Sequence, residues 1–554
     1  MLDKDLLSIQ EVRTKVEKAY QAWQKYRTFS QEQVDAIVER AAAAARANAR
    51  RLAEMAVEET GYGNAKDKYI KNLLNCDWLP RRMRGMKTVG VLRELPEQKM
   101  VEIGVPVGVV AAILPTTNPT STAMYKTLIS LKAGNAVVIS PHPRAHKCTC
   151  ATAGILYKAA IEAGAPEEII QCIDNATLEG TNALMRHERT GVILSTGGAG
   201  IVKAAYSSGK PAFGVGPGNV PVLVDTSADL EDAIPKIVTG KSFDYGTVCS
   251  SEQAIVAESS LRARILALLK SSRAYMCNDA QKDALGKMLV MPNWSINPQC
   301  VGQSPVKLAK MAGFEVPPET SILCAEIAGV GKQHPLSMEK LSPVLALLFV
   351  PDFSTAMDTC HALLKFGGLG HTAVIYATDD ARIRQYGMRM PAMRVLVNTP
   401  APQGSTGITT NVFPSMTLGC GAAAGNITSD NVGPQHLINI KRLSYVVRKP
   451  EEAFEMPLDI NQAPAGPIPT EPAPIDRNTV VAAVERYLAS RGMSVAGSAA
   501  GGPSCDSSCA APATPVKQGV VASVSADVVD RFLARRAASE GKGEAAAGPG
   551  GRPT

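Results

Sequence analysis

Long apolar runs are absent from this 554-residue sequence. The longest strongly apolar stretch, 105–114, is interrupted by Pro106 and Gly108 and is far shorter than the ~20 residues of a membrane-spanning helix. The start of the chain, Met1 to Asp5, also lacks the basic residues and the apolar stretch of a secretory signal. We therefore expect no membrane segment, no export and a cytoplasmic location.

Cysteine is scarce as well, with 12 residues in the whole chain. Most cysteines stand singly in apolar surroundings, as Cys172 and Cys324 do. This distribution is typical of reduced thiols rather than of a disulfide scaffold, and it fits a reducing cytoplasm. Because Cys505 and Cys509 are too isolated to make a four-ligand site, we expect no bound metal.

The sequence also lacks basic blocks and repeats that interleave basic and aromatic residues. Its net charge of +7 is modest and is spread along the chain. Such a charge suits small anionic ligands at most. We therefore expect no nucleic-acid partner.

What the sequence does contain, up to about residue 455, is a regular alternation of helical and strand patterns. Residues 8–58 have strong helix propensity, and short apolar runs of strand length follow from about residue 100. These runs are 109–114, 136–139, 192–194 and 220–224, then 345–350, 373–376 and 395–397, with helical patterns at 121–132, 145–163 and 200–207. Continuous apolar strands spaced by helices predict an α/β fold with two doubly wound parallel sheets buried on both faces.

The composition changes abruptly beyond residue 455, where proline, alanine, glycine and serine dominate. Because such a stretch buries too little apolar surface to offset its ordering entropy, we expect 456–554 to be a flexible tail. Two islands in it resemble each other, because Val484–Arg491 is repeated as Val529–Arg536. They predict short amphipathic helices at about 478–491 and 526–538, each needing a partner surface on another protein or on the chain's own domain.

One cysteine stands apart from the others because of its position. Cys249 follows a glycine-bearing loop, 242–248, and shortly precedes the apolar run 254–256. A cysteine between such a loop and a strand lies at the mouth of a cleft instead of inside a core. A thiol in this position can attack a carbonyl carbon.

Asn118 is a candidate partner for Cys249. It lies in the segment 115–119, at the carboxyl end of strand 109–114 and just before a helix, where ligands bind in open α/β sheets. Its side-chain amide, with the backbone N–H of Cys249, can donate to the oxygen that becomes negative when a thiolate adds to a carbonyl. The other interpretation, that Asn118 caps the following helix, is equally consistent with the sequence.

Three further segments carry residues suited to binding a cofactor. Glycines in 195–200 open a helix after a strand, a geometry that lets the backbone approach a pyrophosphate, although many such turns bind nothing. The glycines of 214–219 indicate close approach to a ligand or to Cys249 itself. Glu339 has a carboxylate suited to a ribose diol, or it is a solvated surface residue.

Taken in order, five segments resemble the aldehyde dehydrogenase superfamily, and specifically its coenzyme-A-acylating branch. They are 115–119, 214–219, 242–249, 339–344 and 368–372, and the resemblance covers about residues 5–450. It implies that Cys249 is the nucleophile, that Asn118 lines the oxyanion hole and that Glu339 holds the nicotinamide ribose. It implies NAD⁺ as cofactor, coenzyme A as co-substrate and a cofactor site that includes Thr117, Ser140, His142, Gly197, Gly198 and Gly216.

The same resemblance implies a division of the chain. Residues 1–225 form the domain that binds NAD and coenzyme A, completed by about 426–455 with a β oligomerisation arm. Residues 226–425 form the catalytic domain. A strand at 443–448 exchanged between subunits implies a homo-oligomer.

Val215 departs from the hydrolytic members of this superfamily, which have a water-activating glutamate at the matching position. We therefore expect the acyl group on Cys249 to be transferred to coenzyme A. His371 is a candidate to assist or orient the incoming thiol, or a structural residue. The segment 140–144 lacks the acidic residue that would reject a 2′-phosphate and contains Arg144, so NADP⁺ stays open beside NAD⁺.

The tail resembles encapsulation peptides that carry enzymes into bacterial microcompartments. This implies shell or core proteins as partners and a short-chain aldehyde as substrate, with propionaldehyde, which would give propionyl-CoA, as the best candidate. Acetaldehyde and sulfoacetaldehyde remain alternatives. So do a hydrolytic aldehyde dehydrogenase and, least favoured, a non-enzymatic scaffold.

Overall fold

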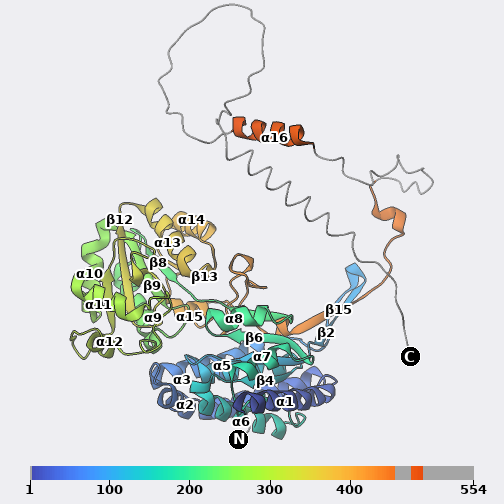
Figure 1. Ribbon diagram of the computed structural model, residues 1–554. Coiled ribbons are helices and arrows are strands. Elements are labelled where there is room, and N and C mark those ends of the chain that lie inside the picture. Colours follow the sequence, from blue (N-terminus) through green and yellow to red (C-terminus); the bar gives the residue numbers. More distant parts are fainter. Residues whose placement is uncertain (1–2, 456–475, 491–554) are drawn as a thin grey trace, which may run out of the picture. The chain divides into compact units, whose positions relative to one another are not determined.

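The computed structural model describes residues 3–455 and 476–490 (Figure 1). The chain divides into two units, residues 1–448 and the part from residue 449 onward. The first unit contains two parallel sheets and a small antiparallel one. The α/β class and the paired parallel sheets expected from the sequence are therefore confirmed.

The chain opens with two long helices, α1 (Lys4–Tyr26) and α2 (Gln31–Thr60), where the sequence predicted helix over 8–58. The side chain of Ser30 accepts a hydrogen bond from the backbone of Gln33, whose own side chain accepts one in return, so that a capping box begins α2. Gly61 ends α2 in the left-handed conformation, with φ 69°. These local signals set the ends of a helix whose alanine-rich face is buried against α5 and α6.

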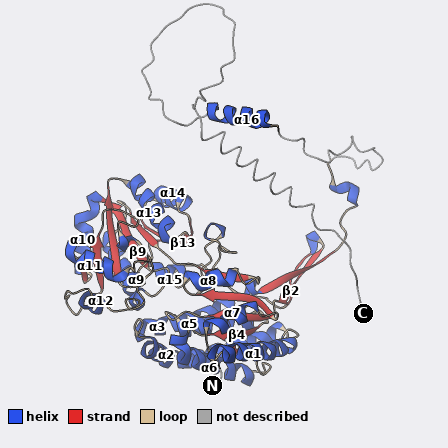
Figure 2. Cartoon of the chain, in the orientation of Figure 1, coloured by secondary structure: helices blue, strands red, loops and turns tan. Residues whose placement is uncertain are grey.

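The first sheet has five parallel strands in the order β5-β4-β3-β6-β7. Figure 2 shows helices, in blue, packed beside its strands, in red. Its strands are β3 (Val109–Ile113), β4 (Ala136–Ser140), β5 (Ile170–Cys172), β6 (Thr190–Thr196) and β7 (Ala212–Val215). The helices between and beside them are α3 (Ala65–Leu73), α4 (Leu79–Met83), α5 (Pro119–Lys132), α6 (His146–Glu162), α7 (Leu178–Arg186) and α8 (Ala199–Tyr206). Every residue of β3 and β4 is buried, as expected for strands covered on both faces.

The second sheet has seven parallel strands in the order β10-β11-β12-β9-β8-β13-β14. They are β8 (Val220–Val224), β9 (Glu252–Glu258), β10 (Ala274–Met276), β11 (Ile322–Glu326), β12 (Val344–Val350), β13 (Gly370–Tyr376) and β14 (Ala392–Val397). Its helices are α9 (Leu230–Ser242), α10 (Arg262–Ser271), α11 (Asp279–Leu289), α12 (Pro305–Met311), α13 (Phe353–Gly367), α14 (Asp380–Arg389) and α15 (Ala401–Ser405).

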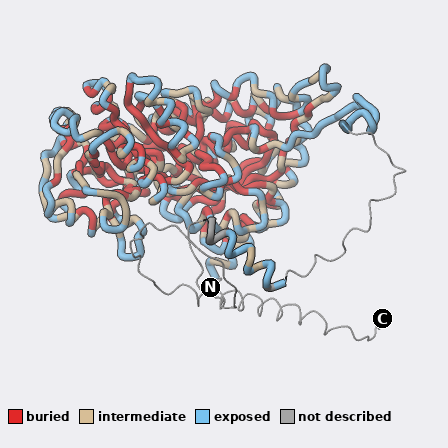
Figure 3. The backbone as a smooth tube through the Cα atoms, turned by 90° about the horizontal axis from the view of Figure 1, so that it is seen from above, coloured by how far each residue is buried: buried red, intermediate tan, exposed pale blue. Residues whose placement is uncertain are grey.

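Alternate residues of these strands belong to two cores. Val222 and Ile255 pack with α9 and α10, whereas Leu223 and Val256 pack with α13 and α14. The two clusters lie on opposite faces because successive side chains of a strand point to opposite sides. Figure 3 shows this buried backbone in the interior and exposed residues toward the periphery.

The strand β8 differs from the sequence-based division at residue 225. It is hydrogen-bonded between β9 and β13 in the seven-stranded sheet, so the chain crosses from the first sheet to the second before residue 220. The sequence could not place this crossing, because an apolar run such as 220–224 fits equally well into either parallel sheet.

The first unit also contains a three-stranded antiparallel sheet, in the order β1-β2-β15. Its strands are β1 (Gly90–Leu95), β2 (Met100–Pro106) and β15 (Ile438–Ser444). The strand was expected at 443–448, but it begins earlier, at Ile438, and pairs with β2 of its own chain. It ends at Ser444 because that residue pairs with Met100, the first residue of β2. Val446 and Val447, just beyond the strand, are exposed.

One disulfide corrects the expectation of single reduced cysteines. Cys150 in α6 is bonded to Cys172 at the end of β5, with 5.7 Å between their Cα atoms. Cys172 was assigned to apolar surroundings, but β5 ends beside α6, which brings the two residues together. The other cysteines that the structure describes form no disulfide.

The second unit contains a 3-10 turn at Pro450–Ala453 and the α-helix α16 (Arg477–Ser490), which overlaps the first predicted island. The side chain of Asp476 accepts hydrogen bonds from the backbones of Asn478 and Thr479 at its start. The second island, 526–538, and Cys505 and Cys509 lie outside the described residues. Among the helices of 3–455 and 476–490, none is long and apolar enough to cross a membrane.

Candidate active site

A cavity of about 1220 Å³ lies between the two parallel sheets. It is larger than the roughly 300–1,000 Å³ that is typical of pockets for drug-sized ligands. Its walls come from loops that join the strands to their neighbouring helices. The two sheets face it with opposite ends of their strands.

The five-stranded sheet contributes the carboxyl ends of its strands. The cavity is lined by 113–118 after β3, 140–144 after β4, 196–201 after β6 and 215–217 after β7. The strand order reverses between β3 and β6, and ligands of open α/β sheets bind at such a reversal. The starts of α5 and α8 lie in the same wall, so unpaired backbone N–H groups face the cavity.

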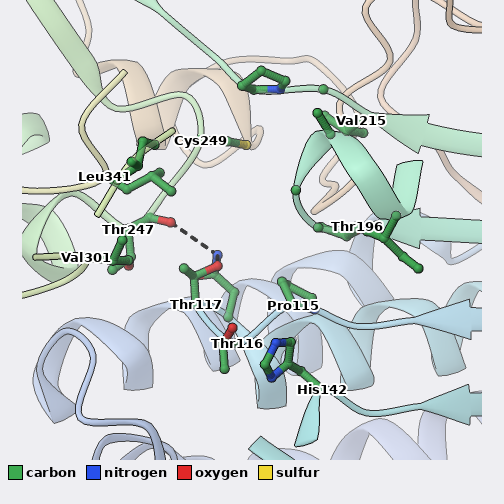
Figure 4. A pocket seen from close by; sticks show the side chains of 18 of the residues that line it. Pro115, Thr116, Thr117, His142, Thr196, Val215, Thr247, Cys249, Val301 and Leu341 are labelled. Atoms are coloured by element: carbon green, nitrogen blue, oxygen red, sulfur yellow. Dashed lines mark hydrogen bonds between the residues drawn. The ribbon is translucent and has the colours of Figure 1, made fainter. Parts of the chain in front are cut away.

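The seven-stranded sheet contributes the segments that precede its strands. They are 247–249 before β9, 338–341 before β12 and 366–367 before β13. Cys249 therefore faces the carboxyl ends of the strands of the first sheet across the cavity. Figure 4 shows its sulfur directed into the space between Cys249 and Val215.

A buried carboxylate holds the loop before Cys249. Asp244 and Tyr245 have φ angles of 47° and 51°, which are unfavourable for residues with a side chain. Oδ1 of Asp244 accepts from the backbone N–H of Asn64 at 2.8 Å, and Oδ2 accepts from Thr247 Oγ1 at 2.6 Å. Lys68 Nζ, at 3.0 Å, and Lys71 Nζ complete its shell. These bonds offset the strained backbone and fix Thr247, two residues before the thiol.

Gly218 is a glycine for steric reasons. A Cβ at this position would overlap the carbonyl oxygen of Cys249 and would contact the ring of His371. The sequence predicted that this loop lies close to a ligand or to Cys249. In the structure, Gly218 lies against the backbone of Cys249. The N–H of Gly218 also donates to Glu339 Oε1 at 3.2 Å, which joins three of the segments.

Asn118 does not use its side chain to cap α5, since within the described chain it makes no such hydrogen bond. Its Oδ1 accepts from Lys71 Nζ instead. Its Nδ2 donates to Thr117 Oγ1 at 3.1 Å and to the carbonyl oxygen of Thr247 at 3.4 Å, drawn as a dashed line at Thr247 in Figure 4. The amide thus turns its donor toward the loop of Cys249, and the long bond to Thr247 is one that a better acceptor can replace.

Lys71 and Asp244 are site residues that the sequence analysis missed. Asp244 was quoted only as part of the loop, and Lys71 lies in a helix that the motifs did not include. The one available signal was the pair Lys68 and Lys71, three positions apart and so on one face of α3. Their common partner, Asp244, is distant in the sequence and meets them only because the fold places α3 beside the Cys249 loop.

Burial dominates the electrostatics of the cavity. It raises the pKa of the Cys249 thiol to about 12, and the neighbouring Glu339 adds to this rise. Burial also raises the pKa of Glu339 to about 8 and lowers the pKa of Lys71 to about 8, the latter against the attraction of Asp244. Near pH 7 the site therefore contains a neutral thiol, a neutral carboxyl group and a mostly charged lysine.

The residues expected to bind a cofactor all line the cavity: Thr117, Ser140, His142, Gly197, Gly198, Gly216 and Glu339. A Cβ built at Gly198 or Gly216 would meet no atom of the described chain within 4 Å, so the backbone is open to a ligand there. The start of α8 supplies N–H groups suited to phosphate oxygens. This wall fits a dinucleotide, with Glu339 available to ribose hydroxyls.

Arg144 also lines the cavity, where its Nη1 donates to the Tyr62 hydroxyl at 3.1 Å and its guanidinium stacks on that ring. His142 Nδ1 accepts from the backbone N–H of Arg144 at 3.1 Å. The arginine is thus held close to the wall that follows β4. Its charge is available there to a negative group of a ligand.

His371 is not among the described residues that line the cavity. It is fully buried, its ring lies against Gly218 as the carbonyl oxygen of Cys249 does, and its Nδ1 is 3.0 Å from Thr372 Oγ1. Burial, with Arg394 nearby, lowers its pKa to about 3. The imidazole is therefore neutral near pH 7 and is a weak base for an incoming thiol.

Comparison with known proteins agrees with this architecture. The model of the family described as "Aldehyde dehydrogenase family" matches residues 6–284. The bifunctional aldehyde-alcohol dehydrogenase AdhE of Escherichia coli (strain K12) is 44% identical over 443 residues, which are 79% of this chain and 50% of that protein. This chain thus spans about half the length of the first curated relatives it matches.

Solved structures are similar over nearly their whole length. An acetylating aldehyde dehydrogenase from Geobacillus thermoglucosidasius is 48% identical with a TM-score of 0.80, and the match covers 81% of this chain and 99% of that one. A propionaldehyde dehydrogenase from the fucose utilisation bacterial microcompartment of Clostridium phytofermentans is 28% identical with a TM-score of 0.70. That match covers 78% of this chain and 97% of the other.

The raised pKa of Cys249 predicts slow alkylation of the ligand-free protein. With a pKa near 12, the thiolate is about one part in 10⁴ at pH 8 and grows tenfold per pH unit. Iodoacetamide labelling of Cys249, followed by peptide mass spectrometry, should accelerate accordingly from pH 7 to pH 9. The variant Glu339→Gln should react faster than wild type at pH 9, because it removes the charge that forms above about pH 8. A labelling rate that does not change between pH 7 and pH 9 would contradict the raised pKa of the Cys249 thiol.

Proposed function

The chain belongs to the aldehyde dehydrogenase family, and on this premise we propose that it oxidises a short-chain aldehyde and transfers the acyl group to coenzyme A. The observation that carries the proposal is the pairing of Cys249 with an oriented Asn118 amide, in a cavity where Val215 takes the place of a water-activating base. The acetylating relative of known structure supports the same reaction.

The first step is the attack of the Cys249 thiolate on the aldehyde carbon, after the thiol, which is neutral near pH 7, has released its proton to solvent. The carbonyl oxygen becomes negative, and Asn118 Nδ2 and the N–H of Cys249 are the donors placed to stabilise it. Lys71 keeps the amide in the orientation that presents Nδ2 rather than Oδ1. A nicotinamide cofactor, when bound, accepts the hydride that leaves this carbon.

The acyl group that remains on Cys249 is a thioester, and its fate depends on which nucleophile is activated. Glu339 is the one carboxylate among the described residues that line the cavity. It is protonated below about pH 8 and its Oε1 accepts from Gly218, so it is a poor base for water near pH 7. Hydrolysis is therefore disfavoured, and transfer to the thiol of coenzyme A is the outcome we propose.

NAD⁺ is the proposed cofactor, with Thr117, Ser140, His142, Gly197, Gly198, Gly216 and Glu339 as its contacts. Arg144 in the same wall makes NADP⁺ an open alternative. His371 is a weak base and does not line the cavity, so in this proposal it acts by packing and not as a general base. Propionaldehyde is the favoured substrate, with acetaldehyde and sulfoacetaldehyde as alternatives.

We propose that the enzyme is a homo-oligomer, joined through the antiparallel sheet. The strand β15 lies at an edge of that sheet and leaves its outer side unpaired within the described chain. Exposed apolar side chains follow the same segment: Ile440, Leu443, Tyr445, Val446 and Val447. An unpaired edge with apolar residues favours pairing with another chain.

We also propose that the tail directs the enzyme into a bacterial microcompartment. The helix α16 exposes Val481 and Val484, an apolar stripe suited to a partner surface. A structural relative belongs to such a compartment. Shell or core proteins are the proposed partners.

The reaction is tested by following NADH formation from propanal and NAD⁺ with and without coenzyme A. We expect sustained turnover only with coenzyme A, and at most one equivalent of NADH per site without it, because the thioester is not hydrolysed. Equal turnover in both assays would establish hydrolytic oxidation instead. If neither assay produces NADH with any of the aldehydes and cofactors tried, the result would favour the alternative of a non-enzymatic scaffold protein.

Replacing Lys71 tests the orientation of Asn118. Lys71→Met frees the amide to rotate, and we expect kcat to fall about 10–100-fold with little change in KM. This loss is smaller than the ~10²–10³-fold loss expected when an oxyanion donor is removed altogether.

Wild-type kcat should also decline as pH rises through about 8, where Lys71 loses its proton, and Lys71→Arg should move this decline to higher pH. Lys66→Met, an exposed position on the same helix, is the matched control. An unchanged kcat in Lys71→Met would show that Lys71 does not orient the Asn118 amide for catalysis.

Deleting residues 456–554 tests the role of the tail. Because the cavity is built entirely from the first unit, we expect the truncated enzyme to keep its turnover. Co-localisation with shell protein in cells should be lost. Lost turnover would mean that the tail contributes to the folded enzyme.

A further inference from the structure

Four side chains with metal-binding atoms meet where α6 begins and β5 ends. His146 is the first residue of α6, and Cys150 lies one turn later on the same face of the helix. Cys172 is the last residue of β5, and Asp174 follows two positions later. None of the four lines the cavity of the proposed active site, so this corner is a separate feature of the chain.

Their ligand atoms lie close together. Nε2 of His146, Sγ of Cys150 and a carboxylate oxygen of Asp174 are all within 4.8 Å of one another. Cys172 is held beside them through its bond to Cys150. In a tetrahedral zinc site, bond lengths of about 2.0–2.3 Å correspond to separations of roughly 3.3–3.8 Å between ligand atoms. Movements of about an ångström would therefore close the set around one ion.

The imidazole of His146 points to a ligand independently of this clustering. Its Nε2 is buried and has no hydrogen-bond partner in the described part of the chain. The nearest carboxylate oxygen, Oδ1 of Asp174, is 4.0 Å away, too far for a hydrogen bond. A buried ring nitrogen that lies within 4.8 Å of a sulfur and a carboxylate oxygen lacks a partner that a metal ion would supply.

We propose that, when Cys150 and Cys172 are reduced, this corner binds one Zn²⁺ ion through His146 Nε2, the two thiolates and Asp174 Oδ1. Two sulfur ligands and one imidazole select zinc over magnesium or calcium, which prefer oxygen. Four protein ligands leave no open position, which is the mark of a structural zinc site.

Cys150 and Cys172 can form either the disulfide or two of the metal ligands, but not both at once. A dithiol reductant breaks the Sγ–Sγ bond by exchange, is itself oxidised to a disulfide and leaves two thiols on the protein. Binding of Zn²⁺ then releases the two thiol protons to solvent and forms the two Zn–S bonds. In either state α6 is tied to β5, close to the segment 140–144 that lines the cavity.

Lys15 shares Asp174 with the proposed ion. Its Nζ lies 2.6 Å from Oδ2 of Asp174 and also contacts Glu11 and the carbonyl oxygen of Cys172. Oδ1, the oxygen that faces His146, is not used by Lys15. The lysine thus orients the carboxylate for the metal, at some cost in electrostatic repulsion.

The test is anaerobic titration of the full-length, dithiol-reduced protein with Co²⁺, a spectroscopic substitute for Zn²⁺. Wild type should bind one equivalent more than Cys150→Ser/Cys172→Ser, with a thiolate-to-cobalt charge-transfer band and the intense visible bands of tetrahedral Co²⁺, both abolished by Zn²⁺. His146→Ala, which retains both cysteines, should weaken this binding at least tenfold. Cys148→Ser is the matched control, because this buried cysteine of the same helix bonds to the carbonyl oxygen of Ala145 and should leave the site intact.

The comparison is unaffected by cysteines elsewhere, since every variant retains Cys249 and the tail. Circular dichroism of each variant verifies that it is folded. Equal Co²⁺ uptake by reduced wild type and Cys150→Ser/Cys172→Ser would overturn the proposal. So would an unchanged affinity and spectrum in His146→Ala.

Discussion

The buried carboxylate of Asp244 is the constraint on which the site depends. It is fully buried, accepts from the Asn64 backbone and Thr247 Oγ1, and is paired with Lys68 and Lys71. Breaking a buried pair of this kind costs about 3–5 kcal/mol, because an uncompensated charge is left in the interior. Through these bonds the carboxylate ties α3 to the loop of Cys249. Lys71 extends the same network to Asn118, so the attacking sulfur and the amide donor are positioned by one set of charges.

The two sheets make this network possible by facing each other with opposite ends. The five-stranded sheet presents the carboxyl ends of β3, β4, β6 and β7, where glycine turns and helix starts suit phosphates and ribose. The seven-stranded sheet presents the segments before β9, β12 and β13, which carry Cys249 and Glu339. A nucleophile on one edge can thus meet a cofactor on the other. Burial of the cavity also explains why the pKa values of Cys249 and Glu339 both rise, since each charged form loses its water.

Particular residues show how far sequence reasoning reached. Cys249, Asn118 and Glu339 were recognisable from motifs in a fixed order, and all three line the same cavity. His371 belongs to one of these motifs, yet its ring is buried and does not line the cavity, because a motif specifies order along the chain and not the direction of a side chain. Cys172 was assigned to apolar surroundings, whereas the end of β5 brings it to Cys150 and, with it, to His146 and Asp174.

The sequence by itself determined the α/β class, many but not all of the strands of the two sheets, and the candidate nucleophile, because periodicity and turn residues are local properties. It did not predict β5, β7, β10 or β11. Only the tertiary structure decided that β8 belongs to the second sheet, that Asn118 bonds to Lys71 instead of capping α5, and that Asp244 is paired with two lysines. It also decided the meeting of His146, Cys150, Cys172 and Asp174. These features join residues distant in the chain through packing and charge pairing, and no local pattern encodes which distant partner a buried group will find.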